Sequence, residues 1–327
     1  MFLASSLLGW FWFWPLPAYL FRPPGPKKTA AKHFRSFIFH AARRPSTLAT
    51  SPPCFRLDSM AASSSCPAAH RVLANELSRH GFDICHYFLP QWYNDSIFAD
   101  GVSVLPPLPN PSLPTAAFLV GNTKRMWPIF MDWVEERKKL EGGDTILKSD
   151  PLDTYTKESI GKVVEENKWR FVRDHHESTG EPSCDIFWSS DTRENRLISM
   201  QRLASVSGLC YLDEASNMAI HPTFGPWLSF RAAIMLFHVG GVDNGGEGDY
   251  SMQSLPMPVA NLLSKAEEMN ARKFVEKAFD KNTRPKDDAT KCLIAARDSV
   301  VLGRDEHRFS DAQLMYHYTK NVKYLYL

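Results

Sequence analysis

Arg231 is the strongest candidate for a functional residue, because it is a charged residue within an apolar segment. It lies in segment 227–238, an apolar run rich in aromatic and β-branched residues that predicts a buried strand. A charge buried in a strand is costly unless it is paired, so Arg231 should meet a carboxylate or another anion. Its partner is either an Asp or Glu of this chain, which the residues alone favour, or a bound ligand.

A rigid turn precedes this strand. Residues 221–226 read His-Pro-Thr-Phe-Gly-Pro, in which two prolines fix φ and one glycine frees it. The turn therefore predicts a fixed backbone geometry next to Arg231.

Familiar catalytic and metal-binding motifs are missing from the sequence. It contains no G-x-S-x-G, no H-E-x-x-H and no Cys-x-x-Cys, and its six cysteines are scattered, which fits a reducing compartment. The glycine-rich stretch 240–249 lacks the phosphate-loop patterns and carries acids, so it predicts a flexible loop. His175 and His176 are neighbours and predict a solvated loop instead of a metal site. We therefore predict no catalytic side chain and no metal site.

Charge is distributed unevenly along the 327 residues. Eight Lys or Arg and no acid precede Asp58, whereas thirty Lys or Arg and thirty-five Asp or Glu follow it. The body of the protein has no basic stripe, which argues against binding to nucleic acid.

The N-terminal 59 residues differ in composition from the rest. Residues 1–21 are apolar and aromatic, whereas 22–56 are rich in Arg, Lys, Ser and Pro. They are a membrane anchor, a cleaved organelle leader, or upstream sequence outside the working protein, and we favour the last two. We expect residues 60–327 to form the functional domain, with Met60 as a plausible start.

The remaining pattern predicts an α+β fold with a largely antiparallel sheet flanked by helices. Asp150 and Pro151 give a clear helix start, as N-cap and first helical residue. Five prolines in 106–114 predict an extended linker. We expect helices over 68–79, 125–139, 150–167, 194–206, 259–279, 290–301 and from 310, and strands over 82–89, 116–120, 169–172, 184–188, 209–212 and 227–238.

Five motifs in order resemble the methylmalonic aciduria and homocystinuria type C protein family, the cyanocobalamin reductases and alkylcobalamin dealkylases. The resemblance spans about residues 70–325 and includes Arg231, which stands where the family has an arginine. The motifs are Gly-Phe-Asp-Ile (81–84) with Trp-Tyr-Asn (92–94), Ala-Phe-Leu-Val (117–120), Asp-Pro-Leu-Asp (150–153), Ile-His-Pro-Thr-Phe-Gly-Pro-Trp (220–227), and Arg-Phe-Ser-Asp (308–311) with Gln313, Tyr316 and Thr319.

This resemblance implies a nitroreductase-like fold and an enzyme that removes the upper axial ligand of cobalamin. Cyanide would leave by reduction with FAD or FMN and electrons from NADPH, and alkyl groups would leave by attack of the glutathione thiolate. It implies a cytoplasmic protein, unless residues 1–59 direct it to an organelle or membrane. Partners would be a flavoprotein reductase and a downstream cobalamin-trafficking protein, and the protein would be a monomer or a ligand-dependent homodimer.

The resemblance also assigns roles to individual positions. Cobalamin would contact Ile198, Ser199, Met200, Gln201, Leu212, Asp213, Glu214, Ala219 and Phe230, although 198–201 also fits an ordinary core helix. Glutathione carboxylates would bind Arg231 and Arg297, with Lys323 as the nearest cation to a third family arginine. The turn would line the site through His221, Phe224, Gly225 and Trp227, and we expect His221 to hold the turn together instead of binding cobalt.

Two alternative functions remain open at this point. Ser205 replaces a family histidine and Leu212-Asp213 replaces a tyrosine pair, which suits a flavoenzyme that reduces another electrophile. The absence of a nucleophile or an acid–base pair suits a non-catalytic cobalamin carrier.

Overall fold

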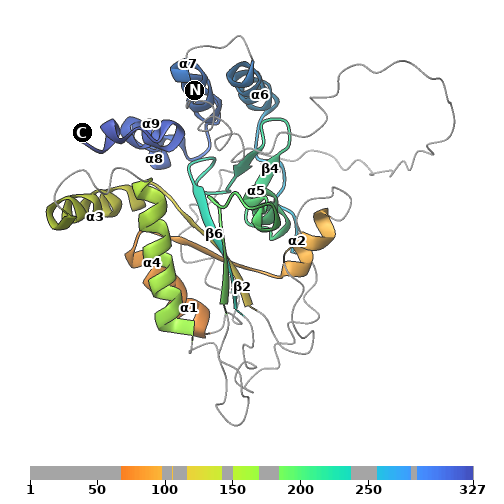
Figure 1. The fold of residues 1–327 in the computed structure, drawn as a ribbon. Coiled ribbons are helices and arrows are strands. Elements are labelled where there is room, and N and C mark those ends of the chain that lie inside the picture. The colour runs from red at the N-terminus through yellow and green to blue at the C-terminus, as the bar shows by residue number, and fades with distance from the viewer. Residues whose placement is uncertain are drawn as a thin grey trace. The chain divides into compact units, whose positions relative to one another are not determined.

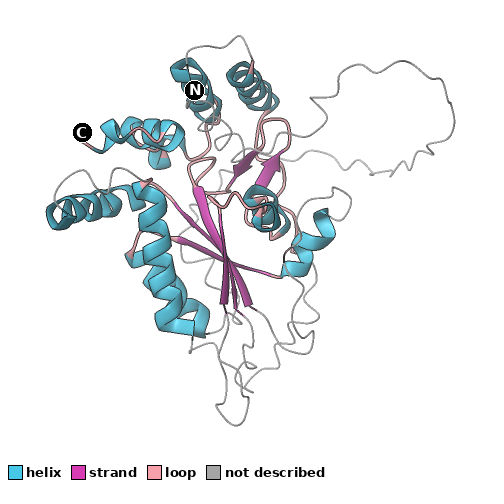
Figure 2. Ribbon diagram, viewed as in Figure 1, coloured by secondary structure: helices cyan, strands magenta, loops and turns pink. Residues whose placement is uncertain are grey.

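A four-stranded antiparallel sheet, in the order β1-β2-β6-β3, forms the centre of the computed structural model (Figure 2). The structure describes residues 68–97, 105, 116–141, 150–168, 184–236, 256–280 and 286–326. The sheet comprises β1 (Ile84–Phe88), β2 (Ala116–Asn122), β3 (Cys184–Trp188) and β6 (Ser229–Leu236), and a separate hairpin pairs β4 (Tyr211–Asp213) with β5 (Met218–Ile220). The predicted α+β class with an antiparallel sheet is confirmed.

Helices occupy much of the remaining described chain. The predicted start of α4 is confirmed, because the Asp150 side chain accepts hydrogen bonds from the backbone amides of Leu152 and Asp153. The α-helices are α1 (Ala68–Arg79), α2 (Pro90–Ile97), α3 (Met126–Glu141), α4 (Pro151–Asn167), α5 (Met200–Val206), α6 (Lys265–Phe279), α7 (Lys286–Asp298), α8 (Arg304–His307) and α9 (Asp311–Thr319). Two 3₁₀ turns are η6 (Glu194–Arg196) and η8 (Val322–Leu325).

The two faces of the sheet support two apolar cores, because side chains alternate along each strand. Phe118, Val120 and Ile234 pack with α1, α3 and α4 on one face. Leu119 and Ala233 pack with α2 and α5 on the other. Figure 1 shows α1, α3 and α4 on one side of β2 and β6, with α2 and α5 on the opposite side.

A β-bulge interrupts this alternation beside Arg231. Ala232 pairs with Val120 while Phe230 pairs with Gly121, so β6 has one residue more than β2 at this point. Phe230 consequently packs against the α5 core, whereas Arg231 is buried close enough to Asp150, Asp153, Tyr316 and Arg297 for their charges to act on it. The bulge thus places Arg231 on the same side of the sheet as Ala232, whereas regular alternation would turn it towards the α5 core.

The turn predicted before β6 is held by its own backbone. His221 and Gly225 exchange two backbone hydrogen bonds of 2.9 Å. Gly225 has φ +58°, and a β-carbon there would lie 1.9 Å from the Leu302 carbonyl oxygen. Only glycine therefore allows this turn to pack directly on the backbone at residues 302–303.

Several expected boundaries were wrong. The single helix expected over 194–206 is instead the 3₁₀ turn η6, a break at 197–199 and α5, because Ser199 caps a new helix. Helix α6 begins at Lys265 and not at 259, since Ser264 and Glu267 form a capping box. Helix α7 starts and ends earlier than expected, and α2, α8 and strand β5 were not predicted. Strand 169–172, the His175 loop, linker 106–114, loop 240–249 and residues 1–59 lie outside the described residues.

Candidate functional site

The residues predicted to contact cobalamin gather mainly on the α5 side of the sheet. Met200 and Ala219 are buried in this core, and Ile198, Phe224 and Phe230 pack against it, half-buried. Ser199 caps α5 through a hydrogen bond from the Arg202 amide, while Gln201 is half-buried. Leu212 pairs with Ala219 in the hairpin. The fold therefore brings most of these positions to one apolar core, which fits the ordinary core role, and corrin binding there stays a prediction.

Asp213 and Glu214 are placed differently. The Asp213 carboxylate is buried and accepts hydrogen bonds from the Ser216 amide, at 3.1 Å, and from the Ser216 hydroxyl. Glu214 is exposed in the same turn. Asp213 thus closes the β4–β5 hairpin, a structural role that accounts for its burial.

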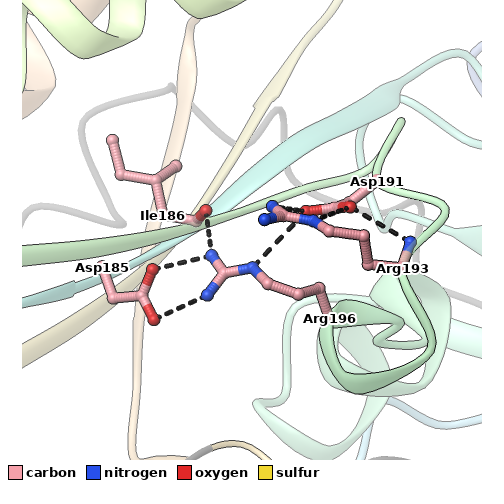
Figure 3. Close-up of polar contacts among 5 residues, drawn as sticks. All are labelled: Asp185, Ile186, Asp191, Arg193 and Arg196. Atoms are coloured by element: carbon pink, nitrogen blue, oxygen red, sulfur yellow. Dashed lines mark hydrogen bonds and ion pairs between the residues drawn. The ribbon is translucent and has the colours of Figure 1, made fainter.

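An ion-pair network fixes the segment that leads into α5 (Figure 3). Arg196 donates two hydrogen bonds to Asp185, of 2.8 and 2.7 Å, and one of 2.6 Å to the Ile186 carbonyl. Its Nε lies 3.4 Å from Asp191, which Arg193 also binds through its Nε and Nη2. The Arg196 guanidinium also lies 4.1 Å from the centre of the Phe187 ring. These contacts anchor 197–199 to β3 and so position Ile198 and Ser199.

Arg231 has no carboxylate partner among the described residues. Its Nε donates a 2.6 Å hydrogen bond to the Asn122 side chain, and it forms no ion pair. Burial lowers the pKa of Arg231, while Asp153 and Asp150 act in the opposite direction without reaching ion-pair distance. The internal ion pair favoured from the residues alone is therefore absent from the described chain.

A second arginine lies beside Arg231. Arg297 is close enough to act on the charge of Arg231, and it donates one hydrogen bond of 3.2 Å to the Leu228 carbonyl. Burial, Arg297, Arg231 and Lys320 hold the pKa of His317 well below its usual range. The histidine is therefore neutral beside three cations, and a negative ligand would relieve their mutual repulsion.

Lys323 does not join this group. It is exposed, and its ammonium lies 4.8 Å from the centre of the Tyr324 ring. Lys320 is the nearby lysine, and it forms a 2.9 Å ion pair with Asp150. Lys320 is also the lysine whose charge acts on His317, while the role expected of Lys323 stays a prediction.

Three buried polar atoms near Arg297 have no hydrogen-bond partner within the described chain. They are Trp227 Nε1, Arg297 Nη1 and the Tyr318 hydroxyl. Trp227 and Tyr318 belong to one apolar group with Phe309 and Leu314, and Arg297 lies over both the Phe309 and Tyr318 rings. We call Trp227, Arg231, Arg297, His317 and Tyr318 the donor cluster.

His317, Tyr318 and Lys320 were not predicted as site residues. They follow the motif positions Gln313 and Tyr316 on α9, and Tyr316 donates a 2.9 Å hydrogen bond to Asp150. Their position on the same helix as those motif residues could have marked them as candidate site residues. Nothing in the sequence, however, showed that α9 packs beside Arg231.

The turn at residues 221–226 is held by contacts of His221 and leads into Trp227 of the donor cluster. His221 Nδ1 accepts hydrogen bonds from the amides of Thr223 and Phe224, and its ring stacks on Phe224 with ring centres 4.6 Å apart. These contacts make His221 a structural member of the turn. Trp227 is fully buried against Phe309 and ends the turn in the donor cluster.

The described residues lack two further features. No three His, Cys, Asp or Glu side chains in this part of the chain come together as metal ligands. None of its helices combines the length and the apolar character needed to cross a membrane.

Comparisons with known proteins point to one fold. No protein-family model and no curated protein sequence matches the chain. Among solved structures, it is similar to the crystal structure of the Caenorhabditis elegans B12-trafficking protein CblC, a homologue of human MMACHC, with a TM-score of 0.56 and 17% sequence identity. The match covers 79% of this chain and 94% of that chain. The resemblance inferred from five sequence motifs is thus confirmed at the level of the fold, and this chain has the fold of CblC.

Proposed function

We propose that this protein is a cobalamin-processing enzyme that removes the upper axial ligand of cobalamin on a nitroreductase-like scaffold. One observation carries the proposal: the bulge in β6 directs Phe230 to the surface predicted to bind the corrin and Arg231 to an anion-binding donor cluster. Both residues lie near the beginning of β6, so a ligand on one side of the sheet would reach the ligand on the other side around this end of the strand. The fold shared with a B12-trafficking protein supports the same assignment.

Dealkylation is the reaction that the donor cluster suits best. Arg231 and Arg297 would hold the two carboxylates of glutathione, since guanidinium groups bind carboxylates in a fork geometry. Their positive charge would also favour the thiolate over the thiol. The thiolate sulfur would attack the carbon bound to cobalt, so that a sulfur–carbon bond forms, the cobalt–carbon bond breaks, and its electron pair stays on cobalt. The chain then needs no nucleophile of its own.

Decyanation is the second reaction, and it rests on the family resemblance. Cyanide would leave when cobalt is reduced with electrons from NADPH through FAD or FMN, either bound here or carried by a flavoprotein reductase. The apolar surface around Met200 and Phe230 would shield the reduced cobalt from water. A downstream cobalamin-trafficking protein would receive the product.

An anaerobic absorbance titration tests the proposal. Protein lacking residues 1–59 is titrated with methylcobalamin and then with glutathione. We expect the spectrum to shift to that of cobalamin with its lower base detached, followed by loss of the methyl–cobalt absorbance. No shift at protein concentrations well above micromolar would overturn cobalamin binding.

A non-catalytic carrier is the second candidate, because the CblC protein of similar fold is described as a trafficking protein. Tight cobalamin binding without loss of the methyl or cyanide group, in the presence of glutathione and of reduced flavin, would identify a carrier. Oxidation of NADPH by a yellow protein without cobalamin would instead identify a flavoenzyme for another substrate.

A further inference from the structure

The unpartnered donors around Arg297 need an acceptor. A buried donor without a partner costs roughly 1–3 kcal/mol, and such groups are rare in folded proteins. Here Trp227 Nε1, Arg297 Nη1 and the Tyr318 hydroxyl are all in this state within one group of packed side chains. Three such donors together indicate a ligand that supplies the acceptor atoms.

The chemistry of these groups defines that ligand. Indole and guanidinium nitrogens donate and cannot accept. Burial raises the pKa of Tyr318, so its hydroxyl keeps its proton and can donate as well. Asp298, whose charge acts on Tyr318, already accepts hydrogen bonds of 2.7 and 3.1 Å from Arg308. The missing acceptor is therefore an anionic oxygen group. It must reach two buried atoms, although Arg297 and Tyr318 are each half-buried as whole residues.

We propose that Tyr318 is a specificity-determining residue whose hydroxyl, together with Arg297 Nη1, binds one carboxylate of glutathione. This inference rests on the proposed function and adds a residue that the family motifs do not indicate. Arg231 then serves the second carboxylate, and the Trp227 indole completes the donor set around the first.

The variant Tyr318→Phe tests this role, because it removes only the hydroxyl. By isothermal titration calorimetry with glutathione, we expect the variant to bind about tenfold more weakly, the loss typical of a hydrogen bond to a charged group. Without glutathione, its melting temperature should equal or exceed that of the unmodified protein, since an unpartnered buried hydroxyl is removed. A structural hydroxyl would instead lower the melting temperature.

Tyr324→Phe is the matched control. It removes the same atom from a half-buried tyrosine that packs against the core of α1, α3 and α4 and lies outside the group formed by Trp227, Phe309 and Leu314. Its glutathione affinity should therefore be unchanged. Glutathione monoethyl ester, which lacks one carboxylate, adds a second check. If the esterified carboxylate is the one at Tyr318, the unmodified protein and Tyr318→Phe should bind the ester equally.

Equal affinity of Tyr318→Phe and the unmodified protein for glutathione would overturn the inference. A lower melting temperature with unchanged affinity would overturn it too. The base-off cobalamin spectrum is recorded on the same samples, so that loss of this inference and loss of the proposed function are distinguished. If the protein binds cobalamin but no glutathione, the role of Tyr318 and glutathione-dependent dealkylation are both refuted. Cobalamin binding itself would then still stand.

Discussion

Arg231 shows how a residue can be costly for the fold and useful for a ligand. A buried guanidinium with one hydrogen bond to Asn122, and with no carboxylate partner among the described residues, lowers stability compared with an apolar side chain. A bound carboxylate would reverse this by pairing with a charge that is already desolvated and fixed in place. In the function proposed above, this unfavourable burial prepares the site for an anion.

Replacing Arg231 by Met tests this balance. We expect glutathione affinity to fall about 10- to 100-fold, because charge-assisted hydrogen bonds are lost. The free energy of unfolding should fall by less than about 1 kcal/mol or rise, since no ion pair is broken. Calorimetry and urea unfolding measure the two quantities.

Arg308→Met provides the contrast. Arg308 is paired with Asp298 and Asp311, so its loss should lower the free energy of unfolding by about 1–2 kcal/mol. A larger loss of stability in Arg231→Met than in Arg308→Met would show that Arg231 is a structural ion-pair residue after all.

The sequence allowed correct predictions for residues whose structure depends on their neighbours in the chain. Asp150 as an N-cap followed by Pro151 depends on neighbouring residues alone, and the structure confirms it. Burial of Arg231 followed from the apolar run around it. The packing of α9 beside β6 alone brings Lys320, His317 and Tyr318 near Arg231, and no local sequence pattern predicts that packing.

At the scale of elements, the bulge in β6 decides what the site can do. With regular alternation, Arg231 would face the α5 core together with Ala233 and Met235. The bulge was not predicted, because one extra residue in an apolar run leaves the pattern of the strand unchanged. The break at 197–199 was missed for a different reason. It depends on the Ser199 cap together with the contacts of Arg196 with β3.

Gly121→Ala tests the bulge. A β-carbon at Gly121 would lie 2.8 Å from the Ser229 carbonyl oxygen, so the backbone beside Arg231 must move. We expect a loss of about 1–3 kcal/mol in the free energy of unfolding and a weaker affinity for glutathione. Gly161→Ala in α4, where a β-carbon meets nothing within 4 Å, should instead raise stability by about 0.5–1 kcal/mol. Equal changes in the free energy of unfolding for Gly121→Ala and Gly161→Ala would contradict this role of the bulge.

Arg196→Leu tests the anchoring of the segment before α5. Loss of its two bonds to Asp185 should free 197–199 and weaken cobalamin binding about tenfold, while glutathione affinity stays within twofold. Arg193→Leu is the control, because that arginine is exposed and its ion-pair partner within the described part of the chain is Asp191, an interaction worth about 0–1 kcal/mol. Absorbance titration and calorimetry measure the two affinities, and equal effects of both variants would refute the anchoring role.

At the scale of the whole molecule, histidines link stability to pH. Burial lowers the pKa of His221 to about 4, and burial also lowers the pKa of His70, His86 and His317 below the ordinary value of 6.5. Between these values the unfolded chain binds protons that the native protein does not, so unfolding is favoured as the pH falls. The stability that these neutral histidines contribute is present above about pH 6.5 and is lost on acidification.

We therefore expect stability to fall between pH 7 and pH 5, with about 2 kcal/mol of the loss due to His221 alone. His221→Asn should remove that part of the pH dependence, because the Asn side-chain oxygen can accept the Thr223 and Phe224 amide hydrogen bonds without titrating. Urea unfolding at pH 7, 6 and 5 measures the effect as a change in midpoint at constant m-value. Parallel pH profiles of the variant and the unmodified protein would mean that His221 is protonated equally in both states, and that the turn before Arg231 is open to water.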